Sequence, residues 1–308
     1  MAYVIKSDLA VADPSNRFPY LTRYGLAPKE LSQYMQALEA EGFVMSETAF
    51  IAFLNFINTL KAAGAWAHIK EIYPLYGASA SHAAIKLKAD WGGPKMIAKN
   101  GLSDASFEVV GGIVRGTHAR NYVDMNSPAF GTGVSAATVG KKWAFTAYVD
   151  ATPIDAAAYV SNPARALWGA SLDDAGTNQT LAEIRFTSTT EAIVSMASGL
   201  RRSSALTFAK PKGVVRFDAQ LAPATSTGWV NDSKYTVSAI PADTVAVDRD
   251  EELWLFAKKP HGVGTVGQGF NGAVRFAAVD NGQLNDAAYT AYYAALVVLM
   301  SALGKTFQ

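Results

Sequence analysis

The amino-acid sequence predicts a mainly β protein with additional α-helices: an antiparallel β-sandwich, an N-terminal helical region and a C-terminal helix. Three observations lead to this fold class. Short runs of β-branched and aromatic residues recur through the middle of the chain, separated by turns that contain glycine or proline. Apolar residues near the N-terminus recur at helical spacing. A long helix with an apolar face is expected close to the C-terminus.

The composition indicates a chain that buries or covers much apolar surface. Of the 308 residues, 50% are hydrophobic and 17% are charged, whereas a typical soluble domain carries about 25% charged residues. Two explanations are open: partner subunits cover part of the surface, or the many alanines raise the apolar count without forming patches. The net charge of +1 gives no indication of nucleic-acid binding.

The residue content excludes several kinds of site. Without cysteine, the chain can form no disulfide, thiolate nucleophile or cysteine-ligated zinc site. The N-terminus lacks the charged start and apolar core of a signal peptide, and the most apolar stretch, residues 294–303, is too short to span a bilayer. We therefore expect a protein made in a cytoplasm, without membrane insertion and without a cofactor.

The chain divides into four parts. Residues 1–25 are expected to form an extended N-terminal arm, residues 26–77 a helical region, residues 78–284 the β-sandwich, and residues 285–308 a helix that packs on the helical region. The arm is either an assembly segment that orders on a neighbour or a frayed terminus. Its candidate assembly contacts are the apolar and aromatic residues Tyr3, Ile5, Phe18 and Tyr20.

Helix boundaries in the second part follow from capping residues. Pro28 suits the first turn of a helix that Gly42 ends. Ser46 then caps a second helix, which ends at Gly64. The stretch from there to Gly77 fits either a short helix or a strand.

The third part supplies the expected strands. They cover residues 107–110, 121–125, 143–149, 166–170, 180–186, 192–196, 213–218, 227–230, 234–240, 253–256 and 273–279. The closing helix begins at Asn285, whose side chain can accept a hydrogen bond from an early backbone N–H, and Gly304 ends it.

Two blocks of sequence carry a family resemblance. The first block, residues 49–88, fits the pattern K-x-A-G-x-W-x-K-I-x-x-x-Y at Lys61, Ala63, Gly64, Trp66, Ile69 and Tyr73, with His68 in place of a lysine. The second block is a glycine loop and strand, with Gly269, Phe270, Asn271, Gly272, Val274, Phe276 and Val279, followed by the closing helix. Together they resemble structural proteins of bacteriophage particles that contain a laminin-G-like (concanavalin A-like) β-sandwich, a jelly roll. The resemblance covers residues 49–304.

This resemblance implies a structural component of a phage particle, located either in the tail tip or fibres or on the head as a decoration or spike. Its place would be the virion, and its partners would be other virion proteins and copies of itself. A trimer is favoured, because symmetric fibres and spikes are commonly trimers. The resemblance also admits contact with a glycan of the host surface.

The sequence shows no catalytic motif, so the chain is not expected to be an enzyme. Gly262, Gly264 and Gly267 fit the dinucleotide pattern G-x-G-x-x-G, but a strand follows instead of a helix, which favours a hairpin loop. No serine stands in a G-x-S-x-G elbow. The four histidines lack the spacing of paired metal ligands and are expected to be structural.

Candidate binding residues lie in the β region. Trp229, beside a glycine in a turn-rich stretch, and Trp168 are candidates for stacking on a sugar ring. Packing in the core or at an interface is the alternative, and it is the more common use of tryptophan. Asp248 and Asp250 are candidates for a calcium loop, with a solvated turn as the alternative.

Two functions remain open at this level. The first is the structural phage protein that acts by assembly and by binding a host glycan. The alternative is a soluble carbohydrate-binding module or glycan-processing enzyme on the same sandwich scaffold. An exposed groove lined by Trp229 or Trp168 beside a carboxylate pair would favour the alternative.

Overall fold

The computed structural model describes the helical region and most of the strands. The described residues are 27–99, 107–108, 113–115, 122–128, 142–150, 165–171, 180–186, 191–198, 204–207, 212–220, 226–237, 252–255, 258–259, 270 and 272–306.

The helices of the described part are α2 (Lys29–Ala40), α3 (Glu47–Ala62), α4 (Ala80–Ala83) and α6 (Asp286–Ala302). Three of these four helices begin at a residue whose side chain accepts from a free backbone N–H, whereas α2 begins after Pro28 without such a cap. The Ala49 N–H donates to Ser46 Oγ at 3.2 Å at the start of α3, and the Ala288 N–H donates to Asn285 Oδ1 at 2.8 Å at the start of α6. Both N-terminal caps confirm the boundaries expected from the sequence.

The strands form two sheets. The first contains β1 (Ile69–Tyr73), β2 (Lys88–Ala89), β4 (Phe107–Glu108), β5 (Ile113–Arg115), β7 (Lys142–Asp150), β12 (Lys212–Gln220), β13 (Ser226–Val230), β14 (Ser233–Val237) and β17 (Ala273–Asp280). The second contains β3 (Ile97–Lys99), β6 (Tyr122–Pro128), β8 (Arg165–Ser171), β9 (Thr180–Phe186), β10 (Glu191–Ser198), β11 (Ser204–Thr207), β15 (Glu252–Leu255) and β16 (Lys258–Lys259).

Strand order shows how distant segments come together. The first sheet runs β14-β13-β12-β7-β17-β1-β2, with β5 also paired to β17 and β4 paired to β5. The second runs β11-β10-β9-β8-β15-β6-β3. Neighbouring strands are antiparallel, except that β16 pairs in parallel with β8. The last strand of the chain, β17, thus lies in the middle of the first sheet.

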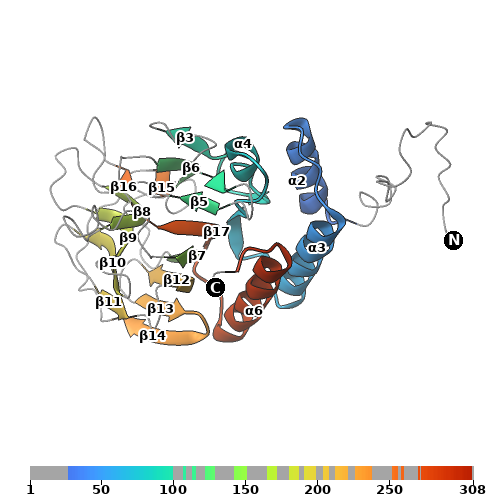
Figure 1. Ribbon diagram of the computed structural model, residues 1–308. Helices are drawn as coiled ribbons and strands as arrows, with labels where there is room; N and C mark the ends of the chain where they lie inside the picture. The colour runs from blue at the N-terminus through green and yellow to red at the C-terminus, as the bar shows by residue number, and fades with distance from the viewer. Residues whose placement is uncertain are drawn as a thin grey trace, which may run out of the picture.

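The first sheet is covered on both faces. Side chains alternate between the faces of a strand, yet the consecutive residues 144–147 of β7 and 276–280 of β17 are all buried. The second sheet covers one face: the Tyr73 hydroxyl on β1 donates to the Met125 carbonyl on β6 at 3.3 Å. Helices α3 and α6 cover the other face, and α2 packs beside α3 (Figure 1). The protein is therefore a β-sandwich with a helical layer on one side.

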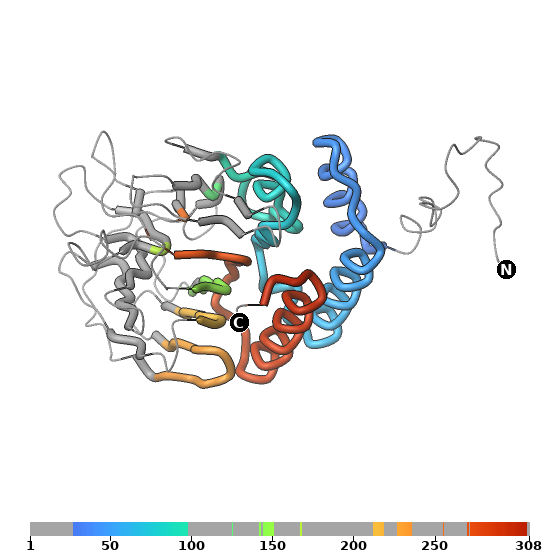
Figure 2. Tube along the Cα trace, viewed as in Figure 1, coloured from blue at the N-terminus to red at the C-terminus, as the bar shows by residue number. Residues whose placement is uncertain are grey.

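The helical layer encloses a continuous apolar core. Helix α6 packs against α3, and Figure 2 shows the two helices side by side next to the first sheet. Phe56 of α3, Phe276 of β17 and Tyr292 of α6 meet edge-to-face or tilted, with ring centroids 6.0–6.5 Å apart. The helical layer and the first sheet therefore share one hydrophobic core.

Most of the coarse architecture agrees with the sequence. The fold class, mainly β with additional α-helices, is confirmed. The stretch that fitted either a helix or a strand forms β1, which pairs with β17 inside the sheet. The expected helical region thus contributes one strand to the sandwich. No helix in the described part of the chain is long and apolar enough to cross a membrane.

Candidate functional site

The hairpin between β13 and β14 is fixed in place by Asn231. The Val214 N–H donates to Asn231 Oδ1 at 2.9 Å, and the Asn231 N–H donates to the Val214 carbonyl at 2.8 Å. The Tyr289 hydroxyl of α6 donates to the Asn231 carbonyl at 2.8 Å. A Cβ on Gly213 would lie 2.4 Å from the Asn231 side chain, so only glycine leaves room for it. Asn231 therefore ties the hairpin to both β12 and α6.

Trp229 lies beneath this hairpin and is not an exposed sugar-stacking residue. It is only 6% exposed, and its ring packs on Tyr289 with centroids 4.3 Å apart. Lys234 Nζ lies 5.3 Å from the Trp229 ring on its outer side. Of the two alternatives for Trp229, packing in the core is therefore the one the structure shows and the stacking role is excluded, because α6 covers the face of the sheet on which its side chain lies.

Two other aromatic side chains stay partly exposed at the same junction of sheet and helix. Tyr148 of β7 lies between Val214 and Phe276 of its neighbouring strands, on the helix-covered face. Tyr293 of α6 stacks on Tyr289 with ring centroids 6.5 Å apart and an interplanar angle of 26°. Both Tyr148 and Tyr293 are partly buried.

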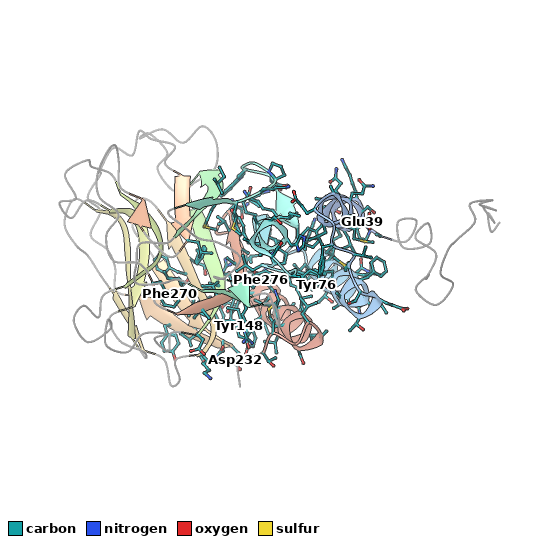
Figure 3. All side chains as sticks on the ribbon, turned by 45° about the horizontal axis from the view of Figure 1, so that its top comes forward. Glu39, Tyr76, Tyr148, Asp232, Phe270 and Phe276 are labelled. Atoms are coloured by element: carbon teal, nitrogen blue, oxygen red, sulfur yellow. The ribbon has the colours of Figure 1, made fainter. Side chains whose placement is uncertain are left out.

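The exposed residue Asp232 completes this surface. It follows Asn231 in the hairpin, and Figure 3 shows Asp232 and Tyr148 at the same end of the molecule beside α6. Burial raises the pKa of the Tyr293 hydroxyl, and the negative charge of Asp232 and the nearby Tyr148 raise it further. Contacts link Tyr293 to the hairpin: Tyr293 stacks on Tyr289, and the Tyr289 hydroxyl donates to the carbonyl of Asn231, the residue before Asp232. We call Tyr148, Tyr293 and Asp232 the tyrosine shelf.

A cluster of buried charge supports the sheet under the shelf. Arg216 is 1% exposed, and its guanidinium donates five hydrogen bonds. Its acceptors are Asp280, with Nη2 to Oδ1 at 3.0 Å, Asp218, with Nε to Oδ2 at 3.1 Å, and Thr146 Oγ1 at 3.2 Å. Burial raises the pKa of Asp218, and the Arg216 guanidinium opposes that shift. All five donors are used, so Arg216 is a structural cation.

A second buried cluster surrounds Glu71 on β1. Its Oε2 accepts from Lys86 Nζ at 2.8 Å, and its Oε1 accepts from the backbone N–H groups of Trp91 and Gly92 at 2.7 and 2.9 Å. Burial raises the pKa of Glu71, while Lys86 opposes the shift. This cluster anchors the segment around β2.

The tyrosine shelf can bind a polyhydroxylated ligand. A partly exposed aromatic ring offers an apolar face and a polar hydroxyl at its edge. An ionised carboxylate accepts hydrogen bonds from hydroxyl groups and can accept more than one. Because Asn231 fixes the hairpin and α6 fixes Tyr293, the surface is preorganised, which reduces the entropy lost on binding.

The other sequence-predicted sites lie at or beyond the limits of the described residues. The backbone of Trp168 belongs to β8, where it pairs with Ile184 and Leu255, and its side chain is outside the described part. Asp248 and Asp250, and the arm residues Tyr3, Ile5, Phe18 and Tyr20, also lie outside the described residues. Within the residues that are described, no three His, Cys, Asp or Glu side chains group in a way that could hold a metal ion.

Sequence reasoning missed the shelf because its members come from three distant segments. The only local signal was the pair Asn231 and Asp232 between two expected strands, which indicates a tight turn. No pattern in the sequence relates that turn to Tyr148 or Tyr293.

Known proteins resemble this chain in structure only. No protein-family model matches the sequence, and no curated protein matches it. A Trypanosoma rangeli sialidase mutant with trans-sialidase activity is 11% identical, with a TM-score of 0.47, over 80% of this chain and 39% of that chain. T. rangeli sialidase in complex with 2,3-difluoro-KDN is 10% identical, with a TM-score of 0.48, over 81% of this chain and 40% of that chain. The Ruminococcus gnavus IT-sialidase CBM40 bound to α2,3-sialyllactose is 11% identical, with a TM-score of 0.36, over 49% and 84%.

One expectation is corrected. The chain was expected not to be an enzyme, and that expectation no longer stands, because sialidases are among the structures to which the chain is similar. The chain spans about two fifths of the length of the T. rangeli sialidases. At these identities and TM-scores, the likeness assigns no activity or substrate to this chain.

Proposed function

We propose that this chain binds carbohydrate and that the tyrosine shelf is its binding surface. The observation that carries the proposal is the pairing of two partly exposed tyrosine rings with an exposed carboxylate on a rigid frame. The scaffold in this proposal is a laminin-G-like (concanavalin A-like) jelly roll, supported by two largely antiparallel sheets that pack face to face.

The chemistry of the shelf suits a sugar better than an apolar ligand. The C–H face of a pyranose ring packs on an aromatic ring, while its hydroxyls need acceptors at the rim. Tyr148 and Tyr293 supply the apolar surface, and Asp232 supplies the acceptor. A purely apolar ligand would leave the Asp232 carboxylate and the tyrosine hydroxyls without new partners, so it would gain less.

Glycan binding by the purified full chain tests the proposal. A printed array of oligosaccharides would identify ligands, and titration calorimetry would measure their affinity. Tyr293→Ala should weaken binding by about fivefold or more, since one sugar–ring contact contributes on the order of 1 kcal/mol or more. Mass spectrometry of the recovered glycans would report any cleavage during the titration.

Tyr235→Ala is the matched control. Tyr235 is 36% exposed, and it projects from β14 on the face opposite to Lys234, away from the shelf. Its loss should leave the affinity unchanged. Thermal unfolding of both variants would show that they fold. Equal weakening by the two substitutions, or no weakening by Tyr293→Ala, would count against the shelf.

A second candidate function is the structural component of a bacteriophage particle, located in the virion at the tail tip, in a fibre or on the head. Beside the sequence resemblance, one structural observation favours it: the exposed faces of α3 and α6 are poor in charge. No charged residue occurs between Glu47 and Lys61 in α3, or after Asp286 in α6. Ile51 is 47% exposed and Val298 is 64% exposed. Such surfaces are typical of contacts with other virion proteins or with copies of this chain, and we favour a trimer.

Labelling of intact phage particles with an antibody to this chain tests the second candidate. Label at the tail tip, fibres or head is the expected result. Deletion of residues 1–23 should reduce incorporation into particles while the sandwich still unfolds cooperatively. Particles without label would overturn the assignment, and normal incorporation of the truncated chain would overturn the assembly role of the arm.

A further inference from the structure

The charges around the tyrosine shelf differ in how accessible they are to a ligand. Asp232 is exposed at the tip of the hairpin. Lys234 Nζ donates to the two carboxylate oxygens of Asp286, at 2.7 and 2.9 Å, and lies over the Trp229 ring. Arg216 is buried, and all five of its donors are used. Lys212, at the end of β12, pairs with Asp150 at 3.7 Å.

We infer that the tyrosine shelf selects uncharged sugars and discriminates against sugars that carry a carboxylate, such as sialic acid. This inference rests on the carbohydrate-binding function proposed above. Its basis is that the accessible charge at the shelf is the carboxylate of Asp232. The cations Lys234, Arg216 and Lys212 are bound to carboxylates already.

The cost of an acidic sugar follows from its position on the shelf. A sugar stacked on Tyr293 would place its ring substituents near Asp232, because Tyr293 stacks on Tyr289, and the Tyr289 hydroxyl donates to the carbonyl of Asn231, the residue before Asp232. Two like charges a few ångströms apart at a protein surface repel strongly enough to weaken binding by roughly tenfold or more. Lys234 or Lys212 would have to leave its carboxylate to offset this repulsion.

The hairpin restricts how far the Asp232 carboxylate can move away from a bound ligand. Asn231 is held by Val214 on one side and by the Tyr289 hydroxyl on the other. The backbone on which Asp232 sits is therefore fixed to β12 and α6. Rotation of its side chain moves the carboxylate by only a few ångströms, which lowers the repulsion without removing it.

Matched glycan pairs test this inference. The full chain would be titrated with neutral oligosaccharides, such as lactose and the other neutral binders found on an array, and with their α2,3-sialylated counterparts. The neutral member of each pair should bind about tenfold more tightly or better. The difference in affinity between the neutral and the sialylated member of a pair should become smaller at high salt, because salt screens exposed charges. Asp232→Asn should narrow it as well, by strengthening the binding of the sialylated member.

Asp90→Asn is the control for charge. It removes one partly exposed carboxylate near β2, far along the sheet from the shelf, and it should leave the ratio of affinities unchanged. Equal or tighter binding of the sialylated members would overturn the inference and leave the carbohydrate-binding function standing. An equal effect of Asp90→Asn and Asp232→Asn on the ratio would also overturn it. Absence of binding to every glycan would overturn both.

Discussion

Two clusters of buried charge stabilise this molecule in different ways. Arg216 binds Thr146, Asp218 and Asp280, which come from β7, β12 and β17. Glu71 binds Lys86 and two backbone N–H groups, all within 21 residues of it in sequence. The first cluster joins three adjacent strands of one sheet across long sequence separations, whereas the second attaches a local segment to β1.

The difference indicates which part of the structure depends on each cluster. Arg216 also lies 5.5 Å from the Tyr289 ring, so its cluster supports the packing of α6 on the sheet. Loss of the first cluster should therefore lower the stability of the whole domain. Loss of the second should open a segment near the edge of the sheet, because proteins open locally in contiguous units.

The largest effect is expected from Arg216→Met. The substitution leaves Asp218 and Asp280 buried without their cation, and breaking a buried ion pair in this way costs about 3–5 kcal/mol. Urea denaturation followed by tryptophan fluorescence would measure the free energy of unfolding. Arg216→Lys restores the charge but not the five-donor geometry, so it should recover part of the loss. A loss below about 1 kcal/mol for Arg216→Met would mean that the cluster does not stabilise the sheet.

Glu71→Gln should have a smaller and more local effect. The amide can still accept from the backbone, but it leaves the buried Lys86 ammonium without its carboxylate, at a cost of about 2 kcal/mol. Hydrogen exchange should accelerate over residues 86–92 and stay unchanged in α6. The double variant with Lys86→Met removes the unpaired charge and should be more stable than Glu71→Gln alone. Faster hydrogen exchange in α6 as well would contradict the local role of the Glu71 cluster.

Lys305 extends the comparison to a buried cation whose described acceptors are carbonyls. It is 1% exposed, and its Nζ donates to the Pro74 and Leu75 carbonyls at 3.1 and 2.6 Å. Burial lowers its pKa well below the ordinary value, and Arg275 lowers it further. Folding therefore releases a proton in the window between the lowered and the ordinary pKa.

The free energy of unfolding should consequently rise with pH across that window, because the unfolded chain binds a proton on Lys305 that the folded chain lacks. The slope should reach up to about 1.4 kcal/mol per pH unit. Lys305→Met should flatten this dependence. Unfolding measured from pH 7 to pH 10 would check it. Identical slopes for the wild type and Lys305→Met would contradict the assignment.

The smallest effect is expected from Lys234→Met. Its ion pair with Asp286 is exposed on both sides, with 40% and 66% of the side chains accessible. Exposed pairs of this kind contribute about 0–1 kcal/mol. The same urea titration should give a loss below that of every buried variant. A loss comparable to that of Glu71→Gln would show that the pair is more than a surface contact.

The sequence predicts the outline of this fold because its boundaries are encoded locally. Ser46 and Asn285 cap helices through their own side chains, and the strand at residues 213–218 falls inside β12. Arg216 could have been noticed too, since a long cation between Val215 and Phe217 in a buried strand needs partners.

The site could not be read in the same way. The first sheet is covered on both faces, so alternation along a strand does not tell which face meets solvent. On β13, for example, three consecutive residues are buried: Gly228, Trp229 and Val230. The sequence around Trp229 therefore does not distinguish a buried from an exposed ring, and it is the packing of α6 that buries it. The exposure of Tyr148 and Tyr293 depends on that same helix.

In the hairpin of β13 and β14, different residues hold the turn in place and present a charge to the solvent. Asn231 and Gly213 hold the turn, while Asp232 projects from it into solvent. If the shelf binds glycans as proposed, a substitution of Asp232 would alter which ligand is accepted without disturbing the packing beneath. Descendants of this chain could then change the ligand that they prefer through substitutions at this one exposed position, while the fold stays the same.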